Sequence, residues 1–196
     1  MTWQDIPGYS DFLPVYDEAV AHFGDGAVFV EVGVALGHSI AYLARKVIDA
    51  GHKRTRIYAV DPWMGTERNG EQQEMLGAKP TGDFGLFCKM MLEHAPEELE
   101  RITVLRVPSV VGACMLREMG EVPSMVLIDG DHTADAVEQD CLAWADAIGY
   151  EGHHAWLCGD DYRDIYPDVA EGVHRVFDRE RVEVIGTQGW TWRVRL

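Results

Sequence analysis

Two clusters of acidic residues stand where they could hold a cation or move a proton. One reads Asp129-Gly130-Asp131-His132 and the other Asp160-Asp161-Tyr162, and each directly follows a short apolar run. Carboxylates that lie close together repel one another, and burying them is costly unless a cation neutralises them. The pattern therefore predicts a divalent metal site with Asp129, Asp160 and Asp161 as ligands. All-oxygen ligands favour Mg²⁺, Ca²⁺ or Mn²⁺ over Zn²⁺. The alternative is a solvated acidic cluster in which Asp131 caps the following helix.

A third group of candidates lies in the turn after the first apolar run, from Glu31 to Ser39. Gly33 allows a sharp turn and a close approach to a ligand, and Gly37 follows four residues later. This spacing differs from the G-x-G-x-x-G pattern that binds dinucleotides. The acid inside the strand end suits a ligand with an ammonium and a sulfonium group. Ser39, near a helix N-terminus, is placed to help hold a carboxylate.

Two further polar residues follow the next two apolar runs. Asp61 ends the second run, where an acid can accept hydrogen bonds from both hydroxyls of a ribose. Ser109 follows the third run and is placed to reach an adenine edge. Taken alone, Ser109 is as readily explained as a helix N-cap.

The chain around these residues alternates short strands with amphipathic helices. Apolar runs predict strands at residues 27–32, 56–61, 102–105, 125–129, 155–158, 182–185 and 190–194. Helical spacing predicts helices at residues 10–23, 39–50, 84–94, 110–119, 134–148 and 168–178. The order predicts a doubly wound, Rossmann-like α/β sandwich, with a mostly parallel seven-stranded sheet and a C-terminal antiparallel hairpin. Ligands of such folds bind beyond the carboxyl ends of the strands, where all these candidates are expected.

The length of 196 residues fits one domain, residues 1–196. Within it, residues 1–24 are expected to form a helical cap, and residues 62–83 a loop that contacts the substrate or closes as a lid. The 33 acidic residues outnumber the 17 basic ones and give a net charge of −16. This charge argues against nucleic-acid and membrane partners. Glu97, Glu98 and Glu100 are expected on a solvated helix face.

Cysteine spacing and the absence of targeting patterns indicate a cytoplasmic protein. No C-x-x-C pair occurs, so free thiols are predicted at Cys88, Cys114, Cys141 and Cys158. The sequence has neither an apolar run of membrane-spanning length nor a secretory signal pattern. A homodimer, in which a partner closes an open pocket, is compatible with a chain of this size.

Taken in order, the motifs E-V-G-V-A-L-G-H-S, A-V-D-P-W, I-D-G-D-H and G-D-D-Y resemble those of class I S-adenosylmethionine-dependent methyltransferases. More narrowly, they resemble the branch of cephalosporin hydroxylase-like and macrocin O-methyltransferase-like proteins, related to catechol O-methyltransferase. The resemblance runs from about residue 27 to the C-terminus. That branch often has His-Asp-Tyr where this chain has Asp160-Asp161-Tyr162, so the expected ligand set departs from the branch pattern.

The resemblance implies a role for each candidate residue. The cofactor S-adenosylmethionine would lie along Glu31, Gly33, Val34, Gly37, Ser39, Asp61, Pro62, Trp63, Ser109 and Asp129. Similar enzymes hold magnesium with an acid from each of the two acidic loops, and place a general base three residues after the first acid. Here that base is His132, with Asp129 as its catalytic partner. His132 would take a proton from an acceptor hydroxyl, whose oxygen would attack the sulfonium methyl.

The implied activity is divalent-metal-dependent O-methylation of a small hydroxylated molecule, such as a sugar, a catechol or a natural-product scaffold. Two alternatives stay open at this point. A nicotinamide-dependent oxidoreductase would share the fold, although the missing third glycine argues against it. A non-catalytic, cofactor-binding module of a biosynthetic assembly would share both the fold and the motifs.

Overall fold

Short apolar runs form the central strands because helices cover both of their faces. The computed structural model describes residues 2–9, 11–64, 83–149, 154–185 and 189–196. Within these ranges the strands are β1 (Val28–Val32), β2 (Arg56–Val60), β3 (Ile102–Leu105), β4 (Met125–Ile128), β5 (Trp156–Gly159), β6 (Glu183–Ile185) and β7 (Thr191–Arg195). They form one sheet in the order β3-β2-β1-β4-β5-β7-β6. Neighbours from β3 to β5 are parallel, while β7 is antiparallel to both β5 and β6. The predicted fold class is confirmed.

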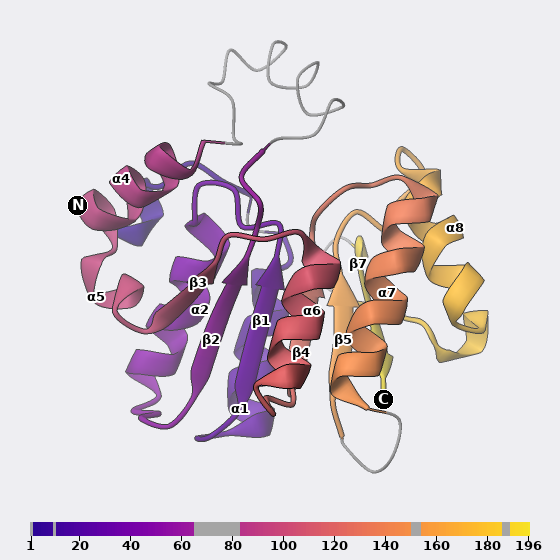
Figure 1. Ribbon diagram of the computed structural model, residues 1–196, viewed down its shortest axis with the longest axis horizontal. Helices are drawn as coiled ribbons and strands as arrows, with labels where there is room; N and C mark the ends of the chain where they lie inside the picture. The colour runs from indigo at the N-terminus through magenta and orange to yellow at the C-terminus, as the bar shows by residue number, and fades with distance from the viewer. Residues whose placement is uncertain (1, 10, 65–82, 150–153, 186–188) are drawn as a thin grey trace.

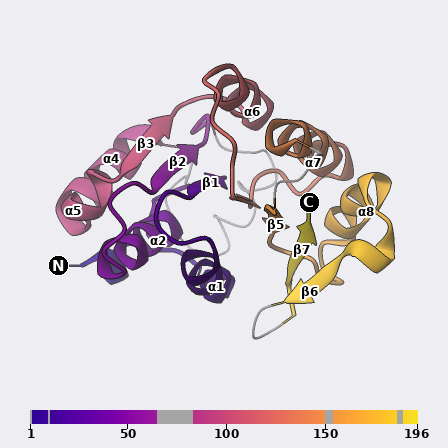
Figure 2. The same ribbon diagram turned by 90° about the horizontal axis from the view of Figure 1, so that it is seen from below.

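The helices of the described residues form a layer on each face of the sheet. They are α1 (Leu13–Phe23), α2 (His38–Asp49), α4 (Phe84–His94), α5 (Pro96–Leu99), α6 (Ser109–Glu118), α7 (Ala134–Ile148) and α8 (Pro167–Val176). Single 3₁₀ turns lie at Trp3–Asp5 and Arg179–Arg181. Figure 2 shows α1 and α2 on one face, α6 and α7 on the other, and α8 beside α7. Helices α4 and α5 lie near the β3 edge (Figure 1).

Each layer encloses its own apolar core, because side chains alternate between the two faces of a strand. Phe29 of β1 packs in the core under α1 and α2 together with Ile40 and Leu43. Its neighbour Val30 packs in the opposite core with Leu116 and Trp144. The four cysteines are free thiols. Among the described residues, no helix is long and apolar enough to cross a membrane.

Helix starts differ from two alternatives raised by the sequence. Thr133, and not Asp131, is the N-cap of α7, and its hydroxyl accepts a 3.3 Å hydrogen bond from the backbone of Ala136. Asp131 instead accepts a 2.9 Å bond from the Thr133 amide, which forms a turn before the helix. Ser109 is the first residue of α6, after an N-cap at Pro108.

The expected solvated face around residues 97–100 is wrong at one position. Glu98 is only 5% exposed. Its carboxylate accepts a 2.7 Å hydrogen bond from Nε of Arg45 on α2, which compensates the charge that α5 buries. Residues 65–82 of the predicted loop lie outside the described residues.

Candidate active site

The strand registers align four predicted site residues along one edge of the sheet. Val32 pairs with Val60 of β2 and with Ile128 of β4, and Ile128 pairs with Gly159 of β5. The residues that follow these strand ends are Gly33, Asp61, Asp129 and Asp160, which therefore lie side by side. This edge is the carboxyl end of the parallel strands, toward which their arrows point in Figure 1.

Gly33 is required by the neighbouring strand as well as by its turn. Its φ of 85° is in the left-handed region, and its amide donates a 3.0 Å hydrogen bond to the Val60 carbonyl. A Cβ at this position would lie 1.9 Å from the carbonyl oxygen of Asp129. The sequence predicted a close approach of this glycine to a ligand. The structure shows a close approach to the backbone of the loop after β4.

Glu31 is fully buried beneath this turn. Its two carboxylate oxygens accept 2.6 Å hydrogen bonds from the hydroxyls of Tyr16 and Ser39. Burial raises the pKa of Glu31 to about 8, against the effect of these two bonds, and Asp129 and Asp61 raise it further. Glu31 and Ser39 are thus brought together, and Tyr16 joins them from α1. Sequence reasoning missed Tyr16, whose only signal was a hydroxyl on an otherwise apolar helix face.

Asp61 joins the turns that follow β1 and β2. Its Oδ2 accepts a 3.0 Å bond from the Ala35 amide and its Oδ1 a 2.6 Å bond from the Trp63 amide. Burial raises the pKa of Asp61, although these backbone bonds lower it. Trp63 is buried, donates from Nε1 to the Ala35 carbonyl at 2.8 Å, and packs on Phe84 and Phe87. Asp61 therefore fixes the geometry of both turns.

Several other predicted cofactor residues lie around this centre. Val34 is buried, and Pro62 is half-buried. Gly37, with a φ of 96°, is the N-cap of α2. Ser109 accepts a 3.0 Å bond at its hydroxyl from Nε1 of Trp144. Burial raises the pKa of the nearby Asp140 to about 6, and a hydrogen bond from Ser109 opposes that rise.

The acidic loops after β4 and β5 place three possible metal ligands together. Nε2 of His132 lies 3.6 Å from Oδ1 of Asp129 and 3.3 Å from Oδ2 of Asp161. In these three side chains, the atoms that could bind a metal all lie within 4.8 Å of one another. His132 Nε2 is buried and makes no hydrogen bond within the described part of the chain, whereas Asp161 Oδ1, also buried, forms an ion pair with Arg163. A buried nitrogen without a hydrogen bond, beside two carboxylates, fits a site that takes up a proton or a cation.

Asp160, the third predicted metal ligand, points to a different partner. Its Oδ1 accepts a 3.4 Å hydrogen bond from the hydroxyl of Thr191 on β7. Burial raises the pKa of Asp160 to about 8, and the charges of Asp129 and Asp11 add to the rise. The close group of possible ligands thus contains His132 in addition to the predicted Asp129 and Asp161, and Asp160 as a ligand stays a prediction. The signal was the three-residue spacing from Asp129 to His132, which the sequence reading assigned to a base.

The surroundings of His132 favour its protonated form. Burial lowers the pKa of the imidazole, but Asp129, Asp161 and Asp131 raise it more, so the net shift is upward from 6.5. The ring also contacts Tyr166, with the ring centres 5.0 Å apart. An imidazole beside carboxylates can accept a proton and keep the resulting charge stabilised.

Arg163 was missed at the sequence level, although it belongs to this site. Its guanidinium forms an ion pair with Asp161 and lies 4.3 Å above the ring of Trp190 and 5.0 Å above that of Tyr166. No local pattern predicts the pairing, because β7 brings Trp190 to this loop from a distant part of the chain.

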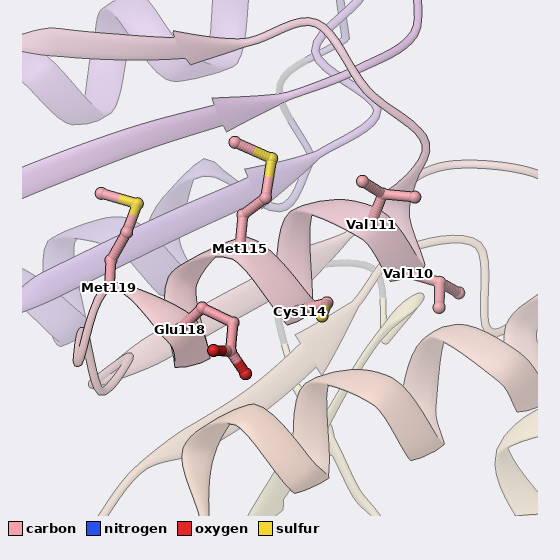
Figure 3. Close-up of a pocket in the computed structure, with 6 residues that line it drawn as sticks. All are labelled: Val110, Val111, Cys114, Met115, Glu118 and Met119. Atoms are coloured by element: carbon pink, nitrogen blue, oxygen red, sulfur yellow. The ribbon is translucent and has the colours of Figure 1, made fainter.

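Two hollows differ in their relation to this site. A cavity of about 10 Å³, enough for roughly one water molecule, lies against Asp131, His132, Asp160 and Trp192. A larger hollow of about 430 Å³ lies along α6 (Figure 3) and is lined by Val110, Val111, Cys114, Met115, Glu118 and Met119. Its lining is apolar except for Glu118 and carries no predicted site residue.

The chain is similar to known methyltransferases. A family model described as a methyltransferase domain matches residues 30–162, more than half of the chain. CalS11, a calicheamicin methyltransferase, is similar in structure, with a TM-score of 0.64 at 13% identity over 93% of this chain and 76% of that one. TomG from Streptomyces achromogenes, an O-methyltransferase of tomaymycin synthesis solved with S-adenosylmethionine, has a TM-score of 0.59 at 15% identity, over 97% and 82%.

Proteins described with different substrates share this fold. A proposed rRNA methylase from Clostridium thermocellum has a TM-score of 0.60 at 12% identity, over 97% of this chain and 100% of that one. No curated protein sequence matches the chain significantly. At these identities the structural likeness establishes the fold, whereas the family-model match establishes the family. The chain belongs to the class I S-adenosylmethionine-dependent methyltransferases.

Proposed function

We propose that the protein transfers the methyl group of S-adenosylmethionine to a hydroxyl of a small molecule, with a divalent cation, Mg²⁺ by preference, at the site. The observation that carries the proposal is the close grouping of Asp129, His132 and Asp161 at the same edge as the turn after β1. Donor and acceptor of a methyl group must meet, and this edge offers a place for both.

The cofactor side is formed by the turns that Asp61 ties together. Asp61 would accept hydrogen bonds from the ribose, and the N-terminus of the 12-residue helix α2 would face the carboxylate of the methionine part. Glu31 is fully buried and holds the hydroxyls of Tyr16 and Ser39, whereas Asp61 is half-buried, so we assign Glu31 to supporting the turn from below. Ser109, Pro62 and Trp63 would complete the adenine and ribose surroundings.

For His132 to act as the general base, its Nε2 must not be bound to the metal ion. Mg²⁺ commonly takes only one or two carboxylates and fills its other positions with water and substrate oxygens. Asp129 and Asp161 would suffice for it, and Asp160 is a third candidate. A bound cation would lower the pKa of an acceptor hydroxyl. Nε2 of His132 would then take the hydroxyl proton while the oxygen attacks the methyl carbon, and S-adenosylhomocysteine would leave.

The acceptor class rests on charge and on the related structures. The net charge of −16 disfavours nucleic acid as a substrate. CalS11 is also described as a TDP-rhamnose 3′-O-methyltransferase, and TomG acts in tomaymycin synthesis. We therefore place sugars, catechols and natural-product scaffolds first among acceptors, and we keep the homodimer as a prediction for sedimentation analysis.

The decisive experiment is a calorimetric titration with S-adenosylhomocysteine, with and without Mg²⁺, followed by methyl transfer to a panel of hydroxylated acceptors. Micromolar binding and EDTA-sensitive transfer would support the proposal. Transfer that EDTA leaves unchanged would remove the metal from it. Binding of NAD without binding of S-adenosylhomocysteine would favour the oxidoreductase, and cofactor binding without turnover on any acceptor would favour the non-catalytic module.

His132→Gln separates the two roles open to its nitrogen. As a base, His132 can be replaced without weakening metal binding, but transfer falls by about 10²–10⁴-fold. As a metal ligand, its loss weakens metal binding directly. Unchanged Mn²⁺ affinity with lost transfer is the result that we expect.

A further inference from the structure

Arg163 places a positive charge directly against one of the proposed metal ligands. Its guanidinium pairs with Oδ1 of Asp161, and its side chain is only 23% exposed. The rings of Trp190 and Tyr166 hold the guanidinium at 4.3 and 5.0 Å. A backbone bond of 2.9 Å from the Arg163 amide to the Asp161 carbonyl keeps the two residues in one tight turn. The guanidinium is therefore fixed in place.

A cation at Asp129 and Asp161 would meet this charge. Arg163 is the partner of Oδ1 of Asp161, while Oδ2 of the same carboxylate lies 3.3 Å from Nε2 of His132. Like charges in a partly buried site repel strongly, because the surroundings screen them less than water does. A metal ion must therefore share Asp161 with the guanidinium or displace it.

We infer that Arg163 is a built-in counter-cation that competes with the divalent metal for Asp161 and keeps metal affinity low. The inference rests on the metal site of the proposed function. It assigns Arg163 a positioning role: it stabilises the acidic loop in the metal-free protein and sets the metal concentration at which the site fills. In the metal-free protein, the Arg163 guanidinium would thus neutralise the charge of Asp161 that the metal ion neutralises when it is bound.

The test is a calorimetric titration with Mn²⁺ in the absence of any acceptor. Arg163→Met keeps the apolar stem against Trp190 and Tyr166 but removes the charge, and should bind Mn²⁺ about tenfold more tightly than the wild type or better. Arg163→Lys keeps a charge and should stay close to the wild type. Adding Asp161→Asn to Arg163→Met should abolish the gain.

Arg175→Met is the matched control, since it also removes one positive charge. Arg175 lies on α8, where it pairs with Asp135, Glu138 and Glu171. Its loss should leave Mn²⁺ affinity unchanged, which excludes a general effect of net charge. Circular dichroism of every variant reports whether the fold is intact, and the affinity for S-adenosylhomocysteine is measured separately.

The outcomes separate the inference from the proposed function. Equal Mn²⁺ affinity in the wild type and in Arg163→Met, with cofactor binding intact, would overturn the inference and leave methyl transfer untouched. Failure of every variant to bind Mn²⁺ would overturn both the inference and the metal part of the proposal. Tighter Mn²⁺ binding by Arg163→Met without any binding of S-adenosylhomocysteine would uphold the inference and overturn methyl transfer.

Discussion

The hydroxyl of Tyr16 donates a 2.6 Å hydrogen bond to Oε2 of Glu31 and so ties α1 to the end of β1. Ser39 holds the other oxygen from α2 at the same distance. A fully buried carboxyl is thereby used to join two helices to the strand that begins the cofactor turn. The neutral carboxyl is stable there, whereas the carboxylate is costly to bury, because neither Tyr16 nor Ser39 is a cation that could compensate its charge.

This burial predicts a pH-dependent stability that Glu31→Gln should remove. The pKa of Glu31 rises from 4.5 to about 8 on folding. The unfolded chain therefore loses the proton first, and the wild type should lose stability as pH rises from about 4.5 to about 8. The variant has no proton to lose. As pH rises through this window, the free energy of unfolding of Glu31→Gln minus that of the wild type should therefore increase by about 2–5 kcal/mol.

Urea unfolding of both proteins at pH 5 and pH 8.5 measures this difference. Tyr16→Phe provides a companion variant, because it removes one hydrogen bond and leaves the carboxyl in place. Parallel pH profiles for the wild type and Glu31→Gln would show that Glu31 does not change its proton affinity on folding.

Asp61→Asn should weaken cofactor binding more than it weakens the fold. The amide can accept only one of the two backbone bonds that the carboxylate now accepts from Ala35 and Trp63. It also presents a donor where ribose hydroxyls would seek an acceptor. We expect a loss of about 10- to 100-fold in affinity for S-adenosylhomocysteine by calorimetry. Asp25→Asn, in the loop before β1 at the opposite edge of the sheet, should retain wild-type affinity; equal losses in both variants would refute the role of Asp61.

His132 should titrate above 6.5 in the metal-free protein. An NMR titration of its imidazole in EDTA measures this pKa directly. Asp129→Asn should lower the value, because a neighbouring negative charge is lost, whereas Asp146→Asn, at a surface pair with Arg117, should not. Since the base must be neutral, methyl transfer should rise with pH, and its midpoint should lie below the metal-free pKa because a bound cation would neutralise the neighbouring acids. A pKa below 6.5 would mean that desolvation outweighs the acids.

Gly33→Ala should be far more damaging than the same change at Gly24. Both glycines have positive φ, 85° and 67°. At Gly33 the new methyl group would meet the Asp129 carbonyl at 1.9 Å, while at Gly24 it would meet nothing within 4 Å. Urea unfolding should show a loss of about 1–3 kcal/mol at Gly24, from backbone strain alone, and at least about 2 kcal/mol more at Gly33. Similar losses at both sites would show that the loop after β4 yields.

Much of the fold was predictable because its central strands are buried on both faces. Such strands appear in the sequence as uninterrupted apolar runs, and the acids that end them stand out by contrast. The order of the runs then determines which strand ends lie together, as Asp129 and Asp161 do. The sequence indicated a helix face around residues 97–100, but four residues carry too little periodicity to predict the bounds of α5 or the burial of Glu98.

The pairings within the site could not be predicted from local sequence. Thr133 and Asp131 are both good caps by residue type, and only the backbone path decides between them. Arg163 and Trp190 belong to different elements and meet because β7 runs antiparallel to β5. Whether Asp160 or His132 faces Asp129 depends on side-chain direction, and residue spacing does not fix this.

The antiparallel direction of β7 brings its first residues to the edge of the sheet where the proposed site lies. Because β7 runs against its neighbour β5, the residues at its beginning reach the catalytic edge, and the Trp190 carbonyl accepts a 2.7 Å bond from the Tyr162 amide there. The cofactor turns belong to β1 and β2, on the other half of the sheet. Substitutions at Trp190 could therefore alter the surface that the proposed function offers to an acceptor while the turns after β1 and β2 stay intact, so that a new substrate would not require a new cofactor site.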